Sequence, residues 1–149
     1  MRENRAGPAV RTLHSRSAAE TEAAGCRLSR HLAPGDVVLL EGALGAGKTT
    51  LVRGIVSGLG ITAQVMSPTY QLVRRYQGPV TLAHADLYRL EAERSLEGLA
   101  LEEEVEDAIV VVEWGDRLRW PGAARVRIEE AGERERLLEL VEAPAAWSW

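Results

Sequence analysis

The stretch Val37–Thr50 decides the fold, and it reads VVLLEGALGAGKTT. Its first four residues are all apolar, which is the pattern of a short strand buried on both faces of a sheet. The residues from Gly42 to Thr49 then match G-x-x-x-x-G-K-[ST]. In such a loop, successive backbone N–H groups point inward as an anion-binding nest, and the N-terminus of the following helix adds its dipole. The sequence therefore predicts a phosphate-binding loop.

The composition of the chain singles out the lysine of this loop. Lys48 is the only lysine, and arginine occupies all the others of the 18 Lys and Arg positions. A compact ammonium fits a narrow phosphate nest, whereas a planar guanidinium does not. Lys48 is predicted to reach the β- and γ-phosphates, and the Thr49 hydroxyl to bind Mg²⁺. We expect ATP with Mg²⁺ to be bound by the following loop residues: Gly42, Leu44, Gly45, Ala46, Gly47, Lys48, Thr49 and Thr50.

Two carboxylates are candidates for the metal side of the site. Glu113 follows the apolar run Val110–Val112, so we expect it at the carboxyl edge of the sheet, where it could hold Mg²⁺ or position the attacking water. Asp86 lies in a stretch whose alternation places His84, Asp86 and Tyr88 on one strand face. That face either lines a site or is a solvated edge, and the spacing leaves both interpretations open.

Periodicity and turn residues predict the helices. One is expected over Ser17–Leu32, where Ser17 as N-cap and Glu20 three residues later form a capping box. A second follows the loop over Thr49–Leu59, up to a glycine. An acidic helix is expected over Glu91–Glu106.

The strands are predicted from apolar runs and from the turns between them. They are Val37–Leu40 and Ile109–Val112, a hairpin of Gln64–Tyr76 with Val80–Leu90, and a hairpin of Arg125–Ile128 with Leu137–Val141. The predicted fold class is α/β: a three-layer αβα P-loop NTPase whose mixed sheet has a parallel core and antiparallel hairpin additions. We expect a basic flexible tail over 1–12, the P-loop ATPase domain over 13–142, and a C-terminal tail over 143–149, whose tryptophans either pack on the body or stay exposed.

Charge and composition limit the possible functions. A chain of 149 residues is one domain by size, and its formal net charge of −4 argues against binding nucleic acid by general electrostatics. Cys26 is the single cysteine, which fits a reducing compartment. No apolar run approaches the ~20 residues of a membrane span. We therefore expect a cytoplasmic protein with no membrane contact.

Four blocks in this order resemble one family, the bacterial tRNA threonylcarbamoyladenosine biosynthesis ATPases called TsaE. The blocks are GALGAGKTTLVRG (42–54), SPTYQLVRRY (67–76), HADLYRL (84–90) and VVVEWGDR (110–117). The resemblance runs from about Leu13 to Val141. The family usually has Asp at the second loop position, where this chain has Ala43. That position is not a required phosphate ligand, so the departure bears on loop stability or partner contact.

The resemblance implies a small P-loop ATPase that works with a transferase complex. This complex places threonylcarbamoyl on adenosine 37 of tRNAs that read codons beginning with A, and the ATPase touches tRNA only indirectly. Thr49 and Glu113 are implied as Mg²⁺ ligands, and Lys48, Asp86 and Glu113 as catalytic residues. Arg136, less favourably Arg134, is implied near the nucleotide, as is the backbone around Ser17 and Ala18. Trp114 follows the strand acid as it does in the family. The segment Ser67–Tyr70, which contains Thr69, is either a proline turn or a loop that senses the phosphates, and its sequence leaves both interpretations open.

Other nucleotide-dependent functions remain as alternatives. A GTPase would need an N/T-K-x-D motif, and the only lysine already belongs to the loop. A small-molecule P-loop kinase shares the loop and the strand acid, but it usually carries a lid with clustered arginines, and Arg74-Arg75 is the only nearby pair. A nucleotide-gated binding module without significant turnover is the third possibility.

Overall fold

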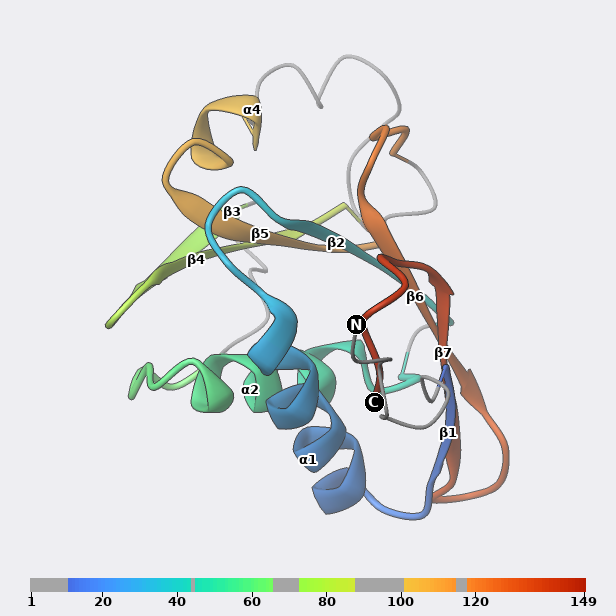
Figure 1. Cartoon of the computed structure of the whole chain (residues 1–149). Coiled ribbons are helices and arrows are strands. Elements are labelled where there is room, and N and C mark those ends of the chain that lie inside the picture. Colours follow the sequence, from blue (N-terminus) through green and yellow to red (C-terminus); the bar gives the residue numbers. More distant parts are fainter. Residues whose placement is uncertain (1–10, 44, 66–72, 88–100, 115–117) are drawn as a thin grey trace, which may run out of the picture.

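The computed structural model describes residues 11–43, 45–65, 73–87, 101–114 and 118–149, and within them it contains one seven-stranded sheet (Figure 1). The strand order is β1-β7-β6-β2-β5-β4-β3. The strands are β1 Thr12–Ser15, β2 Val37–Glu41, β3 Val73–Gln77, β4 Thr81–Asp86, β5 Ala108–Glu113, β6 Ala124–Glu130 and β7 Arg136–Glu142. The helices are α1 Ala18–Leu28, the 3₁₀ turn η1 Ser29–His31, α2 Lys48–Gly58 and α4 Leu101–Glu104.

The centre of the sheet is parallel and its outer parts are antiparallel. β2 pairs in parallel with both β5 and β6, and β4 pairs in parallel with β5. β3–β4 and β6–β7 are antiparallel hairpins, and β1 pairs antiparallel with β7. The predicted mixed α/β sheet, with its parallel core and hairpin additions, is confirmed.

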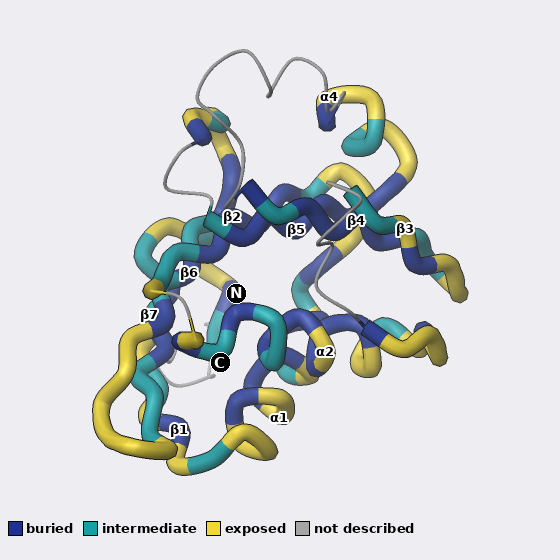
Figure 2. Tube along the Cα trace, turned by 180° about the vertical axis from the view of Figure 1, so that it is seen from behind, coloured by how far each residue is buried: buried dark blue, intermediate teal, exposed yellow. Residues whose placement is uncertain are grey.

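Each face of the sheet has its own apolar core. Along β2, Val38 and Leu40 join a cluster with α1 and α2, whereas Val37 and Leu39 join a cluster that includes Leu101 of α4. Figure 2 shows the central strands buried between these layers. In the described part of the chain, the helix on the second face is α4, with four residues, and it ends before 105 and 106, which the predicted acidic helix included. Residues 91–100 of that prediction lie outside the described residues.

Helices α1 and α2 pack at backbone distance. A Cβ added at Gly54 would overlap the Glu22 carbonyl, and one at Gly25 would overlap the Leu51 carbonyl. The absence of side chains at these positions lets the two helices touch along their length. This contact fixes α2, which follows the glycine-rich loop, against the helix that begins at Ala18.

Several element boundaries differ from the sequence prediction. The first helix is α-helical only to Leu28 and ends in a 3₁₀ turn, and the second begins one residue early, at Lys48. Gln64 and Val65 are not in a strand, so the predicted start of the first hairpin is wrong. The strand β1 was not predicted. It has only four residues, and because the polar Ser15 is one of the buried ones, its alternation of apolar and polar side chains is too weak to indicate a strand.

Residues 143–149 pack against the body of the protein. Trp147 and Trp149 are buried, Trp149 Nε1 donates to the Arg11 carbonyl at 3.0 Å, and Trp147 stacks on His31. This settles the two alternatives left open for the tryptophans. No helix in the described ranges combines the length and the apolar character that a membrane crossing requires.

Candidate functional site

The glycine-rich loop connects β2 to α2. Gly45 and Gly47 have φ angles of 81° and 108°, which side-chain-bearing residues rarely adopt. A Cβ at Gly42 would overlap the backbone carbonyl of Ile128 on β6. Gly47 is the N-cap of α2 and, as a glycine, provides no side-chain acceptor for the N–H groups of the first turn. Leu44, a predicted ligand, lies outside the described residues.

Lys48 is the first residue of α2 and is only 4% exposed. Its Nζ donates to the carbonyl oxygens of Gly42 at 2.7 Å and Ala43 at 2.9 Å. The ammonium also lies 4.0 Å from the ring centroid of Trp114, a cation–π contact. Trp114 has φ 63°, a left-handed conformation that costs about 1–3 kcal/mol for such a residue. The residue whose backbone is strained is therefore the one whose indole contacts Lys48.

Three polar side chains meet beside Lys48, and we call them the Glu113 cluster: Thr49, His84 and Glu113. The Thr49 hydroxyl lies 3.3 Å from Oε1 and 3.1 Å from Oε2 of Glu113. His84 Nε2 lies 2.5 Å from Glu113 Oε2. Glu113 is 3% exposed and His84 is fully buried. A hydroxyl beside a carboxylate is a donor set of hard oxygens, which suits Mg²⁺.

The sheet order explains why these groups meet. β5 lies between β2 and β4, and all three strands are parallel, so their carboxyl ends share one edge. Asp86 is the register partner of Glu113 and is partly buried at this edge. The solvated-edge interpretation fails at His84, which is fully buried. Tyr88, the third residue of the predicted face, and Thr69 lie outside the described residues.

A pocket opens on the other side of the loop, and we call it the Arg136 pocket. Arg136 begins β7, and its guanidinium donates to Ala46 O at 2.9 Å and lies 3.4 Å from Gly45 O. The pocket has a volume of about 510 Å³. Its lining residues are Ser17, Ala18, Ala19, Thr21, Gly45, Gly47, Thr50, Glu133, Arg134 and Arg136. Thus Arg136, Arg134, Thr50 and the start of α1 lie together.

The start of α1 is held by the predicted capping residues. Ser17 Oγ accepts from the Glu20 N–H at 3.1 Å. Glu20 Oε1 accepts in return from the N–H of Arg16 at 3.0 Å, one residue before the N-cap, where a regular capping box would use Ser17 itself. Ser17 is thereby fixed in an extended conformation at the pocket.

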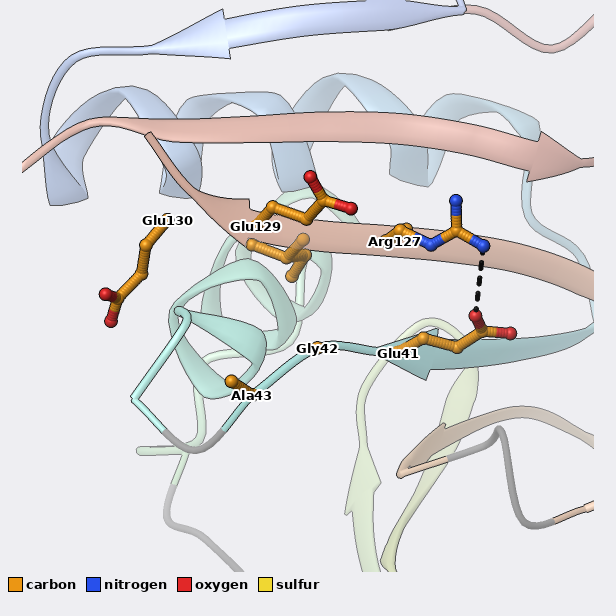
Figure 3. Close-up of a pocket in the computed structure, with 7 residues that line it drawn as sticks. Glu41, Gly42, Ala43, Arg127, Glu129 and Glu130 are labelled. Atoms are coloured by element: carbon orange, nitrogen blue, oxygen red, sulfur yellow. Dashed lines mark ion pairs between the residues drawn. The ribbon is translucent and has the colours of Figure 1, made fainter. Parts of the chain in front are cut away.

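A smaller hollow lies beside the first residues of the loop, against β6 (Figure 3). It measures about 340 Å³, and its charged lining residues are Glu41, Arg127, Glu129 and Glu130. Arg127 pairs with Glu41 at 3.7 Å, and Glu41 also pairs with Arg125 at 2.8 Å. Three carboxylates against one guanidinium disfavour a polyphosphate here. This hollow is therefore a poorer candidate for a phosphate site than the Arg136 pocket, whose lining also includes Gly45 and Gly47 of the loop.

Sequence reasoning missed two contacts of this site. It placed His84 on the face of Asp86 but did not pair it with Glu113, and it did not predict the Trp114 indole on Lys48. The first pairing needs the strand order, because 84 and 113 become neighbours only when β4 lies beside β5. The signal available in the sequence was the alternation of polar residues around Asp86, together with a second strand that ends in Glu113.

Comparisons with known proteins agree on one family. The family described as "Threonylcarbamoyl adenosine biosynthesis protein TsaE" matches residues 15–138. The protein called tRNA threonylcarbamoyladenosine biosynthesis protein TsaE in Mycobacterium bovis is 37% identical over 143 residues, covering 87% of this chain and 82% of its own. The protein of that name in Treponema pallidum is 43% identical over 105 residues, covering 70% and 78%.

A solved structure agrees with the fold as well. The crystal structure of YdiB from Bacillus subtilis superposes with a TM-score of 0.71 at 32% sequence identity, covering 85% of this chain and 81% of that one. The family match spans the loop, the Glu113 cluster and Arg136 together. This chain belongs to the TsaE family.

Proposed function

We propose that this protein is a Mg²⁺-dependent ATPase with the P-loop NTPase fold, which supports the threonylcarbamoyl modification of tRNA adenosine 37. One observation carries the proposal: the only lysine of the chain and the Thr49–Glu113 pair converge at the uncapped N-terminus of α2. Together they offer a cation and N–H donors for phosphate and hard oxygens for a metal.

Each residue of the site has a role in this proposal. Lys48 leaves the carbonyls of Gly42 and Ala43 and binds the β- and γ-phosphates instead, a move from two neutral acceptors to charged ones. Thr49 and Glu113 hold Mg²⁺, which when bound neutralises phosphate charge. Asp86 lies at the same edge and orients the attacking water.

The Arg136 pocket supports a place for the nucleoside. It adjoins Gly45 and Gly47 of the loop, and its floor at Ser17 and Ala18 offers backbone groups to a base. Arg136 contributes a positive charge beside the phosphates while bridging the loop to β7. Because Arg136 bonds the loop directly, we propose that it senses whether the loop is occupied.

The partner is proposed to be the protein complex that carries the tRNA. The chain has a formal net charge of −4, so the phosphate backbone of tRNA gains little from contact with it. The names of its relatives refer to tRNA threonylcarbamoyladenosine biosynthesis. We therefore propose a cytoplasmic ATPase that acts on tRNA only through the transferase subunits, with slow turnover alone.

Steady-state ATPase assays with each component added singly test this function. We expect slow turnover by the isolated protein, acceleration by the transferase subunits, and no acceleration by tRNA alone. A screen for phosphorylated small molecules runs alongside, because a kinase would transfer the phosphoryl group to an acceptor other than water. Strong stimulation by tRNA without protein partners would contradict the proposed division of labour.

A further inference from the structure

We propose that His84 is a positioning residue that holds the Glu113 carboxylate in its metal-binding orientation. The inference rests on the proposed function and adds a residue to it. His84 lies in β4, is fully buried, and places Nε2 2.5 Å from Glu113 Oε2. Among the described residues, His84 has no hydrogen bond or ion pair with the loop or with the lining of the Arg136 pocket, so its influence on the site passes through Glu113.

Glu113 is held from two independent elements. Thr49 approaches from α2 and His84 from β4, while Glu113 itself ends β5. An ionised carboxylate only accepts hydrogen bonds, so both the hydroxyl and the imidazole Nε2–H donate to it. A glutamate has three rotatable side-chain bonds, and a donor on each side removes most of that freedom before a metal arrives.

The second nitrogen of the imidazole shows that packing alone does not account for this residue. His84 Nδ1 is buried and has no hydrogen-bond partner among the residues described. A buried polar atom without a partner is destabilising, and an apolar side chain of similar size would avoid that cost. Its neighbours include Leu82 on the same strand face, the Tyr76 ring 6.4 Å away and Arg74, its register partner on β3. A leucine at position 84 would avoid the unpartnered nitrogen but would lose the contact with Glu113.

The geometry also distinguishes the two carboxylate oxygens. Oε2 receives both His84 and the shorter Thr49 contact, whereas Oε1 has the longer Thr49 contact of 3.3 Å. By holding Oε2, His84 leaves Glu113 with one oxygen, Oε1, that has only the longer contact, and the carboxylate would supply a negatively charged oxygen to Mg²⁺. Outer-shell partners of this kind commonly change metal affinity 10–100-fold when removed.

Calorimetric titration with ATP, in excess Mg²⁺ and in EDTA, tests the inference without relying on turnover. For His84→Leu we expect the gain in ATP affinity caused by Mg²⁺ to fall about 10-fold, with the affinity in EDTA unchanged. His84→Gln should retain most of the gain, because its amide nitrogen can reach the carboxylate from the position of Nε2. Leu82→Val, on the same face, is the packing control and should leave the Mg²⁺ gain unchanged.

A second pair of variants keeps the test decisive if His84→Leu fails to fold. His84→Asn carries the same amide as His84→Gln but is too short to reach Glu113. The inference predicts a loss of the Mg²⁺ gain in Asn and its retention in Gln, and equal behaviour of the two would overturn it. If the wild-type protein binds ATP equally well with and without Mg²⁺, the proposed function is contradicted, and the inference that rests on it is contradicted too.

Discussion

On one side of the glycine-rich loop, Glu113 and His84 come from neighbouring parallel strands in the middle of the sheet, and both are buried. On the other side, Arg136 comes from the start of an outer antiparallel strand, and Ser17 from the turn before α1. The Glu113 cluster is therefore fixed by the core of the protein. The Arg136 pocket is assembled from segments far apart in the sequence and stays open to solvent.

The difference bears on what each side can tolerate. A substitution in the Glu113 cluster disturbs groups that are desolvated and that bond one another, so the effects are large and coupled. Charged groups at the Arg136 pocket are partly screened by water, so removing one of them should have only a small effect on binding. The proposed function places metal chemistry on the rigid side and nucleoside contact on the adaptable side. The following variants test that contrast, from the largest expected effect to the smallest.

Lys48→Ala should eliminate nucleotide binding on both sides at once. It removes the one ammonium of the loop, which makes charge-assisted bonds worth about 1.5–3 kcal/mol each. We expect ATP affinity to fall about 1,000-fold or more, measured by calorimetry. Arg53→Ala, an exposed basic residue of the same helix, is the control. Near-wild-type affinity in Lys48→Ala would refute the loop as the binding site.

Glu113→Gln should affect only the metal side. The amide keeps the size of the side chain but loses the negative charge that is proposed to hold Mg²⁺. We expect ATP turnover in the presence of the partner complex to fall about 100-fold, while ATP affinity in EDTA stays within about twofold of wild type. If affinity without metal fell as strongly as turnover, the contrast between the two sides would be wrong.

Gly54→Ala should disturb both sides through the helix pair. The added methyl overlaps the Glu22 carbonyl, and since both partners are helix backbone, the helices must separate. We expect the free energy of unfolding to fall by about 2 kcal/mol in urea denaturation. Ser57→Ala, exposed on α2, provides the control and should be close to neutral. An equally neutral Gly54→Ala would mean that the helices can move apart freely.

Arg136→Ala should give the smallest effect and should leave the metal side intact. It removes the bonds to Ala46 O and Gly45 O at a partly exposed position. We expect about a 10-fold loss of ATP affinity, equal in Mg²⁺ and in EDTA, with the turnover rate at saturating ATP unchanged. Arg134→Ala, an exposed neighbour in the same pocket, should change affinity less. A loss confined to Mg²⁺ conditions would place Arg136 on the metal side instead.

The sequence was sufficient for the parts of this molecule that depend on local pattern. The run before Gly42, the loop itself and the run before Glu113 each have a short-range signal, and these segments form β2, the loop and β5 as expected. No local pattern predicts that Glu113 and His84 lie on neighbouring parallel strands, because strand order is set by packing across the whole sheet. The same holds for β1, whose pairing partner lies at the other end of the chain.

The position of β7 in the chain has a consequence for synthesis. β1 has β7 as its neighbour in the sheet, and Trp149 bonds Arg11 across 138 positions, so the outer half of the sheet closes only after β7 and Trp149 have been made. Contacts of such long sequence separation form slowly. On a ribosome, the loop and β5 emerge well before Arg136, so a nascent chain has the elements of the Glu113 cluster before those of the Arg136 pocket. The two sides of the loop come together only after β7 has been made.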